Sequence, residues 1–151
     1  MGQQVIEHTV TTTAGPATVF ALLADGSTWP SWSPIDSFEL LEQGDGMPEG
    51  LGALRQFTTG RHHSVERVVT VESNQVFSYT LVKGMAIRDY QAVITLTPTG
   101  TGTSIHWRST FKAKFPPAGP IFRSALGKFI GQTVKGLGEA AAKAQVSDSV
   151  G

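Results

Sequence analysis

The sequence predicts an α+β domain in which one long C-terminal helix packs on an antiparallel sheet. Between Pro120 and Gln145 apolar residues recur at three- and four-residue steps, which places them on one helix face. Most of the preceding chain alternates apolar and polar residues in short runs, as half-buried strands do. A helix with so broad an apolar face must bury it against the sheet. A long helix on a curved sheet can leave a cavity, and we expect the function there.

The N-terminal third is expected to hold one strand and two short helical segments. The strand covers residues 5–12, and Ala14-Gly15-Pro16 ends it. Pro16 suits the first position of a short amphipathic helix that ends near Asp25-Gly26. The segment from Thr28 to Pro34 contains two prolines, so we predict a single helical turn or a tight loop.

Six further strands are expected before the long helix. Glycine-containing or polar pairs such as Ser73-Asn74 and Gly84-Met85 form turns between several of them. Pro116 to Pro120 forms a hinge. Residues 1–145 are predicted to be a single domain, and residues 146–151 a flexible tail. The six expected strands cover about residues 38–43, 52–59, 63–72, 75–83, 88–97 and 104–115.

Composition argues against several classes of function. The chain of 151 residues has 12 basic and 12 acidic side chains, so its formal net charge is zero. No overall basic field is therefore expected to attract nucleic acid or anionic membranes. The absence of cysteine excludes disulfides, thiolate metal sites and cysteine nucleophiles. Neither a signal peptide nor an apolar run of roughly 18–20 residues is visible, so we expect a cytoplasmic protein without stable membrane insertion.

Motifs for metals and cofactors are missing as well. His62 and His63 are adjacent on an expected strand and point to opposite faces, so they cannot easily bind one ion. His8 shares a strand face with apolar neighbours and is interpreted as a core histidine. No nucleophile elbow, phosphate loop or dinucleotide fingerprint occurs. We expect no metal, no cofactor, and a monomer or weak dimer.

Several strings of residues occur in a consistent order along nearly the whole chain. They are ATVFALLAD at 17–25, WPSWSP at 29–34, ERV at 66–68, FSY at 77–79, RDY at 88–90, ITLTP at 94–98 and the Gly-Thr-rich turn before Trp107. Together they resemble the START and birch-pollen-allergen-like superfamily (SRPBCC), and within it the polyketide cyclase/dehydrase-like proteins. The resemblance implies a helix-grip fold. In that fold a strongly bent, seven-stranded antiparallel sheet wraps around the C-terminal helix, with a mostly apolar tunnel between them.

Strand alternation predicts which side chains face the helix. The pattern is clear in three strands. In the strand at 75–83, Phe77, Tyr79 and Leu81 are expected to face inward. In each of the next two strands, one set of alternating residues is expected to face inward, the first beginning at Tyr90 and the second at Ile105. These two sets are Tyr90, Ala92, Ile94 and Leu96, and Ile105, Trp107, Ser109 and Phe111.

The strand at 63–72 is ambiguous. Its valines favour the row of Val65, Arg67, Val69 and Val71 as the buried one. The resemblance implies instead that Glu66 reaches the cavity, with a bulge that restores the later alternation. We favour Glu66, and leave the facing of Arg55 beside Phe57 open.

The expected cavity contains aromatic faces, a tyrosine hydroxyl and a charged group, as small-molecule pockets often do. Candidate catalytic residues are Glu66, Arg67 and Tyr79. The Trp29/Trp32 pair is interpreted either as a hydrophobic plug or as a ligand contact. The predicted ligand-binding residues are Trp29, Trp32, Phe57, Glu66, Phe77, Tyr79, Leu81, Tyr90, Ile94, Trp107, Phe122, Leu126, Phe129 and Ile130.

Three functions fit these features. The first is intracellular binding of a small hydrophobic molecule, such as a lipid, fatty acid, sterol or polyketide-like compound. The second, implied by the resemblance, is a polyketide cyclase, aromatase or dehydratase acting in the same cavity. The third is a protein–protein module similar to the stress-chaperone activator branch of the superfamily. Fold alone does not choose among them.

Overall fold

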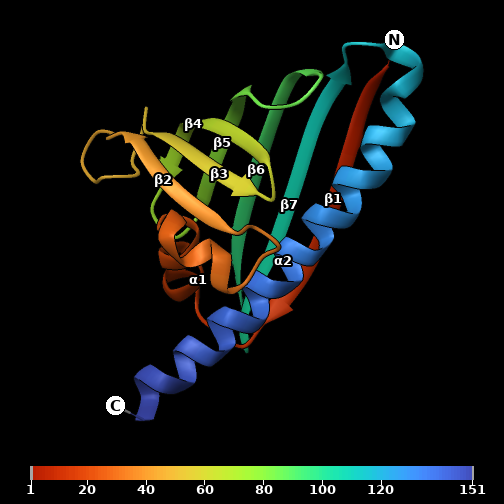
Figure 1. Ribbon diagram of the computed structural model, residues 1–151. Helices are drawn as coiled ribbons and strands as arrows, with labels where there is room; N and C mark the ends of the chain where they lie inside the picture. Colours follow the sequence, from red (N-terminus) through yellow and green to blue (C-terminus); the bar gives the residue numbers. More distant parts are fainter. Residues whose placement is uncertain (1, 151) are drawn as a thin grey trace.

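A single antiparallel sheet of seven strands bends around one side of a long C-terminal helix (Figure 1). This computed structural model describes residues 2–150. The strands occur in the spatial order β1-β7-β6-β5-β4-β3-β2, and every neighbouring pair is antiparallel. The helix-grip architecture predicted from the sequence is confirmed. The strands are β1 (Gln3–Thr12), β2 (Ser37–Glu42), β3 (Leu54–Thr59), β4 (His62–Glu72), β5 (Val76–Lys83), β6 (Ile87–Thr99) and β7 (Gly102–Ala113).

Two short helical elements follow β1, as expected. Helix α1 spans Pro16–Leu23 and has its proline in the first turn, where no backbone N–H is needed. The tryptophan–proline segment forms a 3-10 helix, η1 (Gly26–Ser31). The Asp25 carboxylate caps η1 by accepting a hydrogen bond from the Ser27 backbone N–H at 3.1 Å.

The long helix α2 spans Gly119–Val150 and follows a short 3-10 turn, η2 (Pro116–Ala118). The backbone of residues 146–150, which belong to the predicted flexible tail, is therefore helical. Of that predicted tail, Gly151 lies outside the described residues. Helix α2 packs mainly on β1 and α1.

The two halves of α2 pack differently. In the second half Val134, Leu137 and Ala141 are fully buried and form the main core with α1, η1 and the sheet. In the first half Phe122, Leu126 and Phe129 are only half-buried. The apolar stripe of α2 is continuous, but only its second half meets a filled core.

Glycines let α2 approach its neighbours closely. A Cβ atom at Gly136 would collide with the backbone carbonyl oxygen of Trp32, and one at Gly131 would stand 3.1 Å from the His8 ring. Close packing therefore accounts for Gly136 and Gly131. Gly127 has open space where a Cβ would lie.

Candidate functional site

A cavity of about 390 Å³ lies between the first half of α2 and the concave face of the sheet. Its walls come from β3 to β7, from α2, and from Trp29 in η1. The wall is mostly apolar. The cavity exists because the half-buried residues of α2 face the bent sheet without filling the space beneath them.

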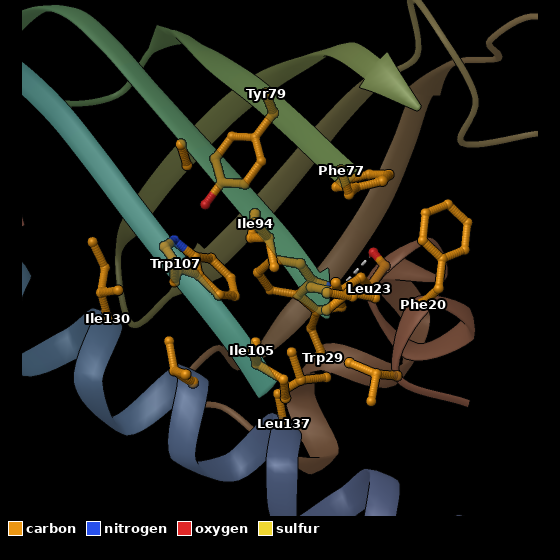
Figure 2. Packing of buried hydrophobic residues seen from close by; sticks show 14 of the residues in the cluster. Phe20, Leu23, Trp29, Phe77, Tyr79, Ile94, Ile105, Trp107, Ile130 and Leu137 are labelled. Carbon is orange, nitrogen blue, oxygen red and sulfur yellow. Dashed lines mark hydrogen bonds between the residues drawn. The ribbon is translucent and has the colours of Figure 1, made fainter. Parts of the chain in front are cut away.

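Eleven of the fourteen residues predicted to bind a ligand lie on the cavity wall. Figure 2 shows Tyr79, Trp107 and Ile130 around this part of the interior. The eleven residues are Trp29, Phe57, Glu66, Tyr79, Leu81, Tyr90, Trp107, Phe122, Leu126, Phe129 and Ile130.

Phe77, Ile94 and Trp32 do not line the cavity, which corrects their predicted placement. Phe77 and Ile94 face inward as expected but pack at the filled end of the core, where Phe77 meets Phe20 edge-on. Trp32 is sealed beneath Gly136 of α2 and donates its indole N–H to the Thr28 hydroxyl at 3.0 Å. The two tryptophans therefore have different positions. Trp32 is buried in the core, whereas Trp29 also contributes to the cavity wall.

Seven wall residues were not predicted from the sequence. Alternation along β3 and β4 could have indicated Thr59, His62 and Ser64, because they share the inward parity of Phe57 and Glu66. Ile35 and Met85 lie in irregular segments, where no periodicity applies. The complete set of seven is Ile35, Thr59, His62, Ser64, Met85, Ala125 and Thr133.

Irregular pairing in β4 decides the facing of Glu66. The β4–β5 register shifts between Val65 and Glu66 and again between Val68 and Thr70. As a result Val65, Glu66 and Val68 are all buried, and Val69 is exposed. The preference for Glu66 with a bulge is confirmed, and the valine-based assignment of the odd row is wrong.

Arg67 does not reach the cavity, which corrects its nomination as a catalytic candidate. Its side chain is 41% exposed and lies 3.7 Å from the Glu42 carboxylate. Its Nη1 donates to the Gly52 carbonyl at 2.8 Å. Arg67 thus tethers the loop before β3 on the outer side of the sheet.

Behind the cavity wall, Arg55 is completely buried among aromatic rings. Its guanidinium carbon lies 4.9 Å from the ring centroids of Phe57 and Phe77 and 5.1 Å from that of Trp29. Its Nη1 donates at 3.0 Å to the Leu23 carbonyl and at 3.0 Å to the Glu49 carboxylate.

Glu49 is the principal partner of this arginine. Its Oε1 also accepts the Gly26 backbone N–H at 2.7 Å. Glu49 lies in the loop between β2 and β3, and nothing in the sequence pattern marks it as buried.

Glu66 is the second acidic residue beside Arg55, and its contact with Arg55 does not offset the cost of burying its charge. The distance from its Oε1 to Arg55 Nη2 is 3.7 Å, too long for a good hydrogen bond, and both atoms lack a hydrogen-bond partner among the described residues. Burial outweighs the attraction of Arg55 and raises the pKa of Glu66 from 4.5 to about 7. The carboxyl group is therefore substantially protonated near neutral pH and can donate or accept a proton.

Two tyrosine hydroxyls lie near Glu66. The ring centroids of Tyr79 and Tyr90 are 6.3 Å apart, and the Tyr90 hydroxyl lies 3.0 Å from the Ser109 hydroxyl. Burial raises the pKa of Tyr90 to about 12 and that of Tyr79 well above its usual value. Both phenols are neutral donors at physiological pH.

Trp107 adds an unpaired donor to the same wall. Its indole nitrogen is buried and has no hydrogen-bond partner among the described residues. In Figure 2 this nitrogen and the Tyr79 hydroxyl are turned toward the same part of the interior. An unpaired buried N–H costs roughly 1–3 kcal/mol, which a ligand oxygen could recover.

The two adjacent histidines separate as their spacing predicts. Both are exposed, but His62 borders the cavity, whereas His63 does not, and His63 Nδ1 lies 2.8 Å from the Thr58 hydroxyl. The His8 ring is half-buried against α2, and its Nε2 lies 3.0 Å from the Gly127 carbonyl oxygen. Over the part of the chain with described side chains, no three His, Cys, Asp or Glu residues are grouped to hold a metal.

Comparison with known proteins identifies the family and the fold. Residues 3–145 match the family model for polyketide cyclase/dehydrase and lipid transport. No curated protein matches the chain. Within residues 2–150, no helix is long and apolar enough to cross a membrane.

Solved structures share the fold at low sequence identity. A START superfamily protein from Mycobacterium smegmatis has a TM-score of 0.78 and 18% identity, covering 92% of this chain and 97% of that chain. Ara h 8.0201 has a TM-score of 0.71 and 22% identity, covering 97% and 99%. Norcoclaurine synthase from Thalictrum flavum, in complex with dopamine and hydroxybenzaldehyde, has a TM-score of 0.71 and 14% identity, covering 93% and 87%.

Proposed function

The chain belongs to the polyketide cyclase/dehydrase and lipid transport family, and from that premise we propose that it binds a small hydrophobic molecule between the sheet and α2. In this function residues 1–145 form the binding domain of a cytoplasmic monomer or weak dimer that needs no metal or cofactor. The single observation that carries it is the cavity of about 390 Å³ with a mostly apolar wall. Small-molecule pockets typically measure roughly 300–1,000 Å³.

The polar groups on the wall limit what the ligand can be. Trp107 Nε1 has no acceptor among the described residues, and the carboxyl group of Glu66 has an unpaired oxygen there. A pure hydrocarbon would leave both unsatisfied, at a cost that an oxygen-bearing molecule avoids. We therefore propose a ligand with an apolar body and one or more carbonyl or hydroxyl groups that reach Trp107 and Glu66. A fatty acid, a sterol or a polyketide-like ring compound meets this description.

Catalysis in the same cavity is the second candidate, and a specific observation favours it. Glu66 has a pKa of about 7 beside two neutral tyrosine hydroxyls. An acid–base group titrating near neutral pH in a dry site is suited to the proton transfers of cyclisation and dehydration. In that function Glu66 would move the proton, and Tyr79 would hold a developing oxyanion.

A cavity-filling substitution tests binding. Ser64 lies on the cavity wall in β4, and we expect Ser64→Phe to place a ring in the cavity. We expect this change to weaken binding of a fluorescent naphthalene sulfonate probe, or of a saturated fatty acid that displaces it, at least about tenfold, because the ring occupies the space the ligand needs. Fluorescence titration gives the two dissociation constants.

His63→Phe is the matched control, because His63 is the preceding residue of β4 and is exposed. It should leave affinity within about twofold. Equal affinity in all three proteins would place the probe outside the cavity and refute the proposal. Chromatography with mass analysis of a poly-β-ketone model compound recovered after incubation separates the two functions. Unchanged mass and retention time indicate binding alone, whereas loss of water, or a new isomer of the same mass formed by ring closure, indicates catalysis.

A further inference from the structure

We propose that the surface around the cavity mouth docks on a lipid bilayer with anionic headgroups. This mouth surface consists of residues 59–63, 82–89 and 112–128. It contains the β3–β4 and β5–β6 hairpins, the end of β7, η2 and the first part of α2 (Figure 1). The docking does not depend on which ligand occupies the cavity.

Contacts between distant segments bring this surface together. A Cβ atom at Gly84 would collide with the His63 carbonyl, so the two hairpins lie side by side. The Lys114 backbone N–H donates to the Ala86 carbonyl at 3.1 Å, which joins the end of β7 to the β5–β6 hairpin. Met85, His62 and Ala125, from three of these segments, all border the cavity. The surface therefore surrounds the entrance.

Positive charge is concentrated on the mouth surface. Its three segments contain seven basic residues and one acidic residue, Asp89, a formal charge of +6. Asp36 borders the surface, where its Oδ2 accepts the Gly60 N–H at 2.6 Å, and lowers the local charge to +5. The seven basic residues are Arg61, Lys83, Arg88, Lys112, Lys114, Arg123 and Lys128, and all are exposed.

These cations lack ionic partners among the described side chains. None of the seven takes part in an ion pair within residues 2–146. Arg88 and Lys112 are even directly opposite each other on β6 and β7. Like charges in cross-strand pairs destabilise a sheet, so a set of unpaired cations indicates an external anionic partner.

Exposed apolar side chains project from the same surface. Ile121 is 71% exposed and Phe115 is 69% exposed, and no other large apolar side chain among the described ones is more exposed. Val82 on the β5–β6 hairpin is a third. Basic residues that surround apolar tips match the boundary between headgroups and acyl chains, where charge attracts and apolar groups insert. Nucleic acid would satisfy the charges but leave Ile121 and Phe115 in water.

The expectation of no attraction to anionic membranes rested on a net charge of zero. Since the whole chain is neutral and the mouth surface carries +6, the remaining residues carry −6. Steering by a charged surface depends on local charge within about a Debye length, roughly 8–10 Å, and not on the total. The fold separates charges that composition averages out.

Vesicle binding tests the proposal. The full-length protein is mixed with vesicles of phosphatidylcholine alone, or with about a third phosphatidylserine, and bound protein is measured by flotation. We expect binding to the anionic vesicles only, and a decrease as salt is raised. The double variant Lys114→Glu/Arg123→Glu should weaken it about thirtyfold or more, because it removes two basic residues from the mouth surface and adds two acidic ones.

The charge control is Lys135→Glu/Lys143→Glu, which makes the same change at exposed positions in the second half of α2. Insertion is followed by tryptophan emission. The emission of the Phe115→Trp variant should shift to shorter wavelength when anionic vesicles are added. That of the Leu51→Trp variant, changed at a residue 50% exposed in the loop before β3, should not.

Four results would overturn the proposal. Two concern the vesicles: the protein binds neither kind, or it binds both kinds equally. The other two are equal weakening by the two charge variants, and equal emission shifts in the Phe115→Trp and Leu51→Trp variants. These outcomes are distinguishable from a failure of ligand binding, which is measured without vesicles by the Ser64→Phe titration.

Discussion

Glu66 on the cavity wall and Arg55 behind it form an unequal pair. Arg55 is satisfied mainly by Glu49, and its second nitrogen lies 3.7 Å from Glu66. Removing one member of a buried charge pair usually costs several kcal/mol, so the ion pair with Glu49 stabilises Arg55 in the interior. Glu66 is left with desolvation that its attraction to Arg55 does not offset. Because of this imbalance, Glu66 is the group on the cavity wall that gains or loses a proton near neutral pH.

The raised pKa predicts how stability depends on pH. Below pH 4.5 Glu66 is protonated in both the folded and the unfolded chain. Between pH 4.5 and about 7 the unfolded chain releases the proton while the folded protein keeps it, so the free energy of unfolding falls as pH rises. Above about pH 7 the fall stops. A shift of this size corresponds to roughly 3 kcal/mol.

Glu66→Gln removes this titration. Relative to the wild type, the variant should gain roughly 3 kcal/mol between pH 4.5 and pH 8, measured by urea unfolding across that range. Glu49 also titrates with a raised pKa, but it is present in both proteins and cancels in the difference. Glu39→Gln, at an exposed position on β2, should run parallel to the wild type. If the Glu66→Gln curve is also parallel, Glu66 does not have a raised pKa.

The sequence could predict part of this site at the residue scale. Strand alternation correctly indicated Tyr79 and Trp107 because β5 and β7 are regular where these residues lie, and it indicated Tyr90 although the β6–β7 register shifts between Arg88 and Gln91. It failed on β4, where two register shifts bury Glu66 beside Val65. Only the family resemblance favoured Glu66. Glu49 was not predictable, because its role depends on a loop that folds back onto Arg55.

At the scale of elements, the two halves of the continuous helix α2 have different functions. Its second half packs into the core through Val134 and Leu137, and its first half lines the cavity through Leu126 and Phe129. Helical periodicity identified the apolar stripe but could not locate the change from core to cavity. That position depends on where the sheet bends away from the helix, which is a property of β3 to β7 and not of α2.

The glycines of α2 give a matched pair of substitutions. Gly136→Ala should lower the free energy of unfolding by about 1–3 kcal/mol, because its Cβ meets the Trp32 carbonyl, which is backbone and cannot rotate away. Gly127→Ala should raise it by about 0.5–1 kcal/mol, because open space surrounds the new methyl group and alanine favours the helix. Urea unfolding at one pH measures both.

Opposite signs for these two changes would support close packing as the reason for Gly136. If Gly136→Ala stabilises the protein as Gly127→Ala does, then α2 can move away from Trp32 without cost. That result would favour the alternative explanation, a helix soft enough to shift when a ligand enters.

At the scale of the whole molecule, the fold separates properties that the sequence reports only as averages. The neutral chain becomes a molecule with a basic mouth surface and an acidic remainder. The apolar content likewise divides between a filled core and a cavity of about 390 Å³. Periodicity predicted a long helix packed on an antiparallel sheet, because both elements depend on local patterns, and the family resemblance implied the helix-grip architecture with its tunnel. Charge separation depends on contacts between distant segments, so no local pattern reports it.

A hollow interior predicts that the protein gains stability when the cavity is occupied. A ligand that binds only the folded state at about 100 times its dissociation constant adds about 2.7 kcal/mol. For a chain of 151 residues this should raise the melting temperature by roughly 5–10 °C. The naphthalene sulfonate probe or the displacing fatty acid can be used, with melting followed by circular dichroism at 222 nm in order to avoid probe fluorescence.

Ser64→Phe and His63→Phe again separate cavity binding from surface binding. The rise in melting temperature caused by the ligand should persist in His63→Phe. It should nearly vanish in Ser64→Phe, whose ring already occupies the cavity. The unliganded Ser64→Phe protein should melt no more than a few degrees from the wild type, because the ring enters existing space near the half-buried first half of α2 and displaces no buried core residue. A rise of equal size in both variants would mean that the probe stabilises the fold from outside the cavity.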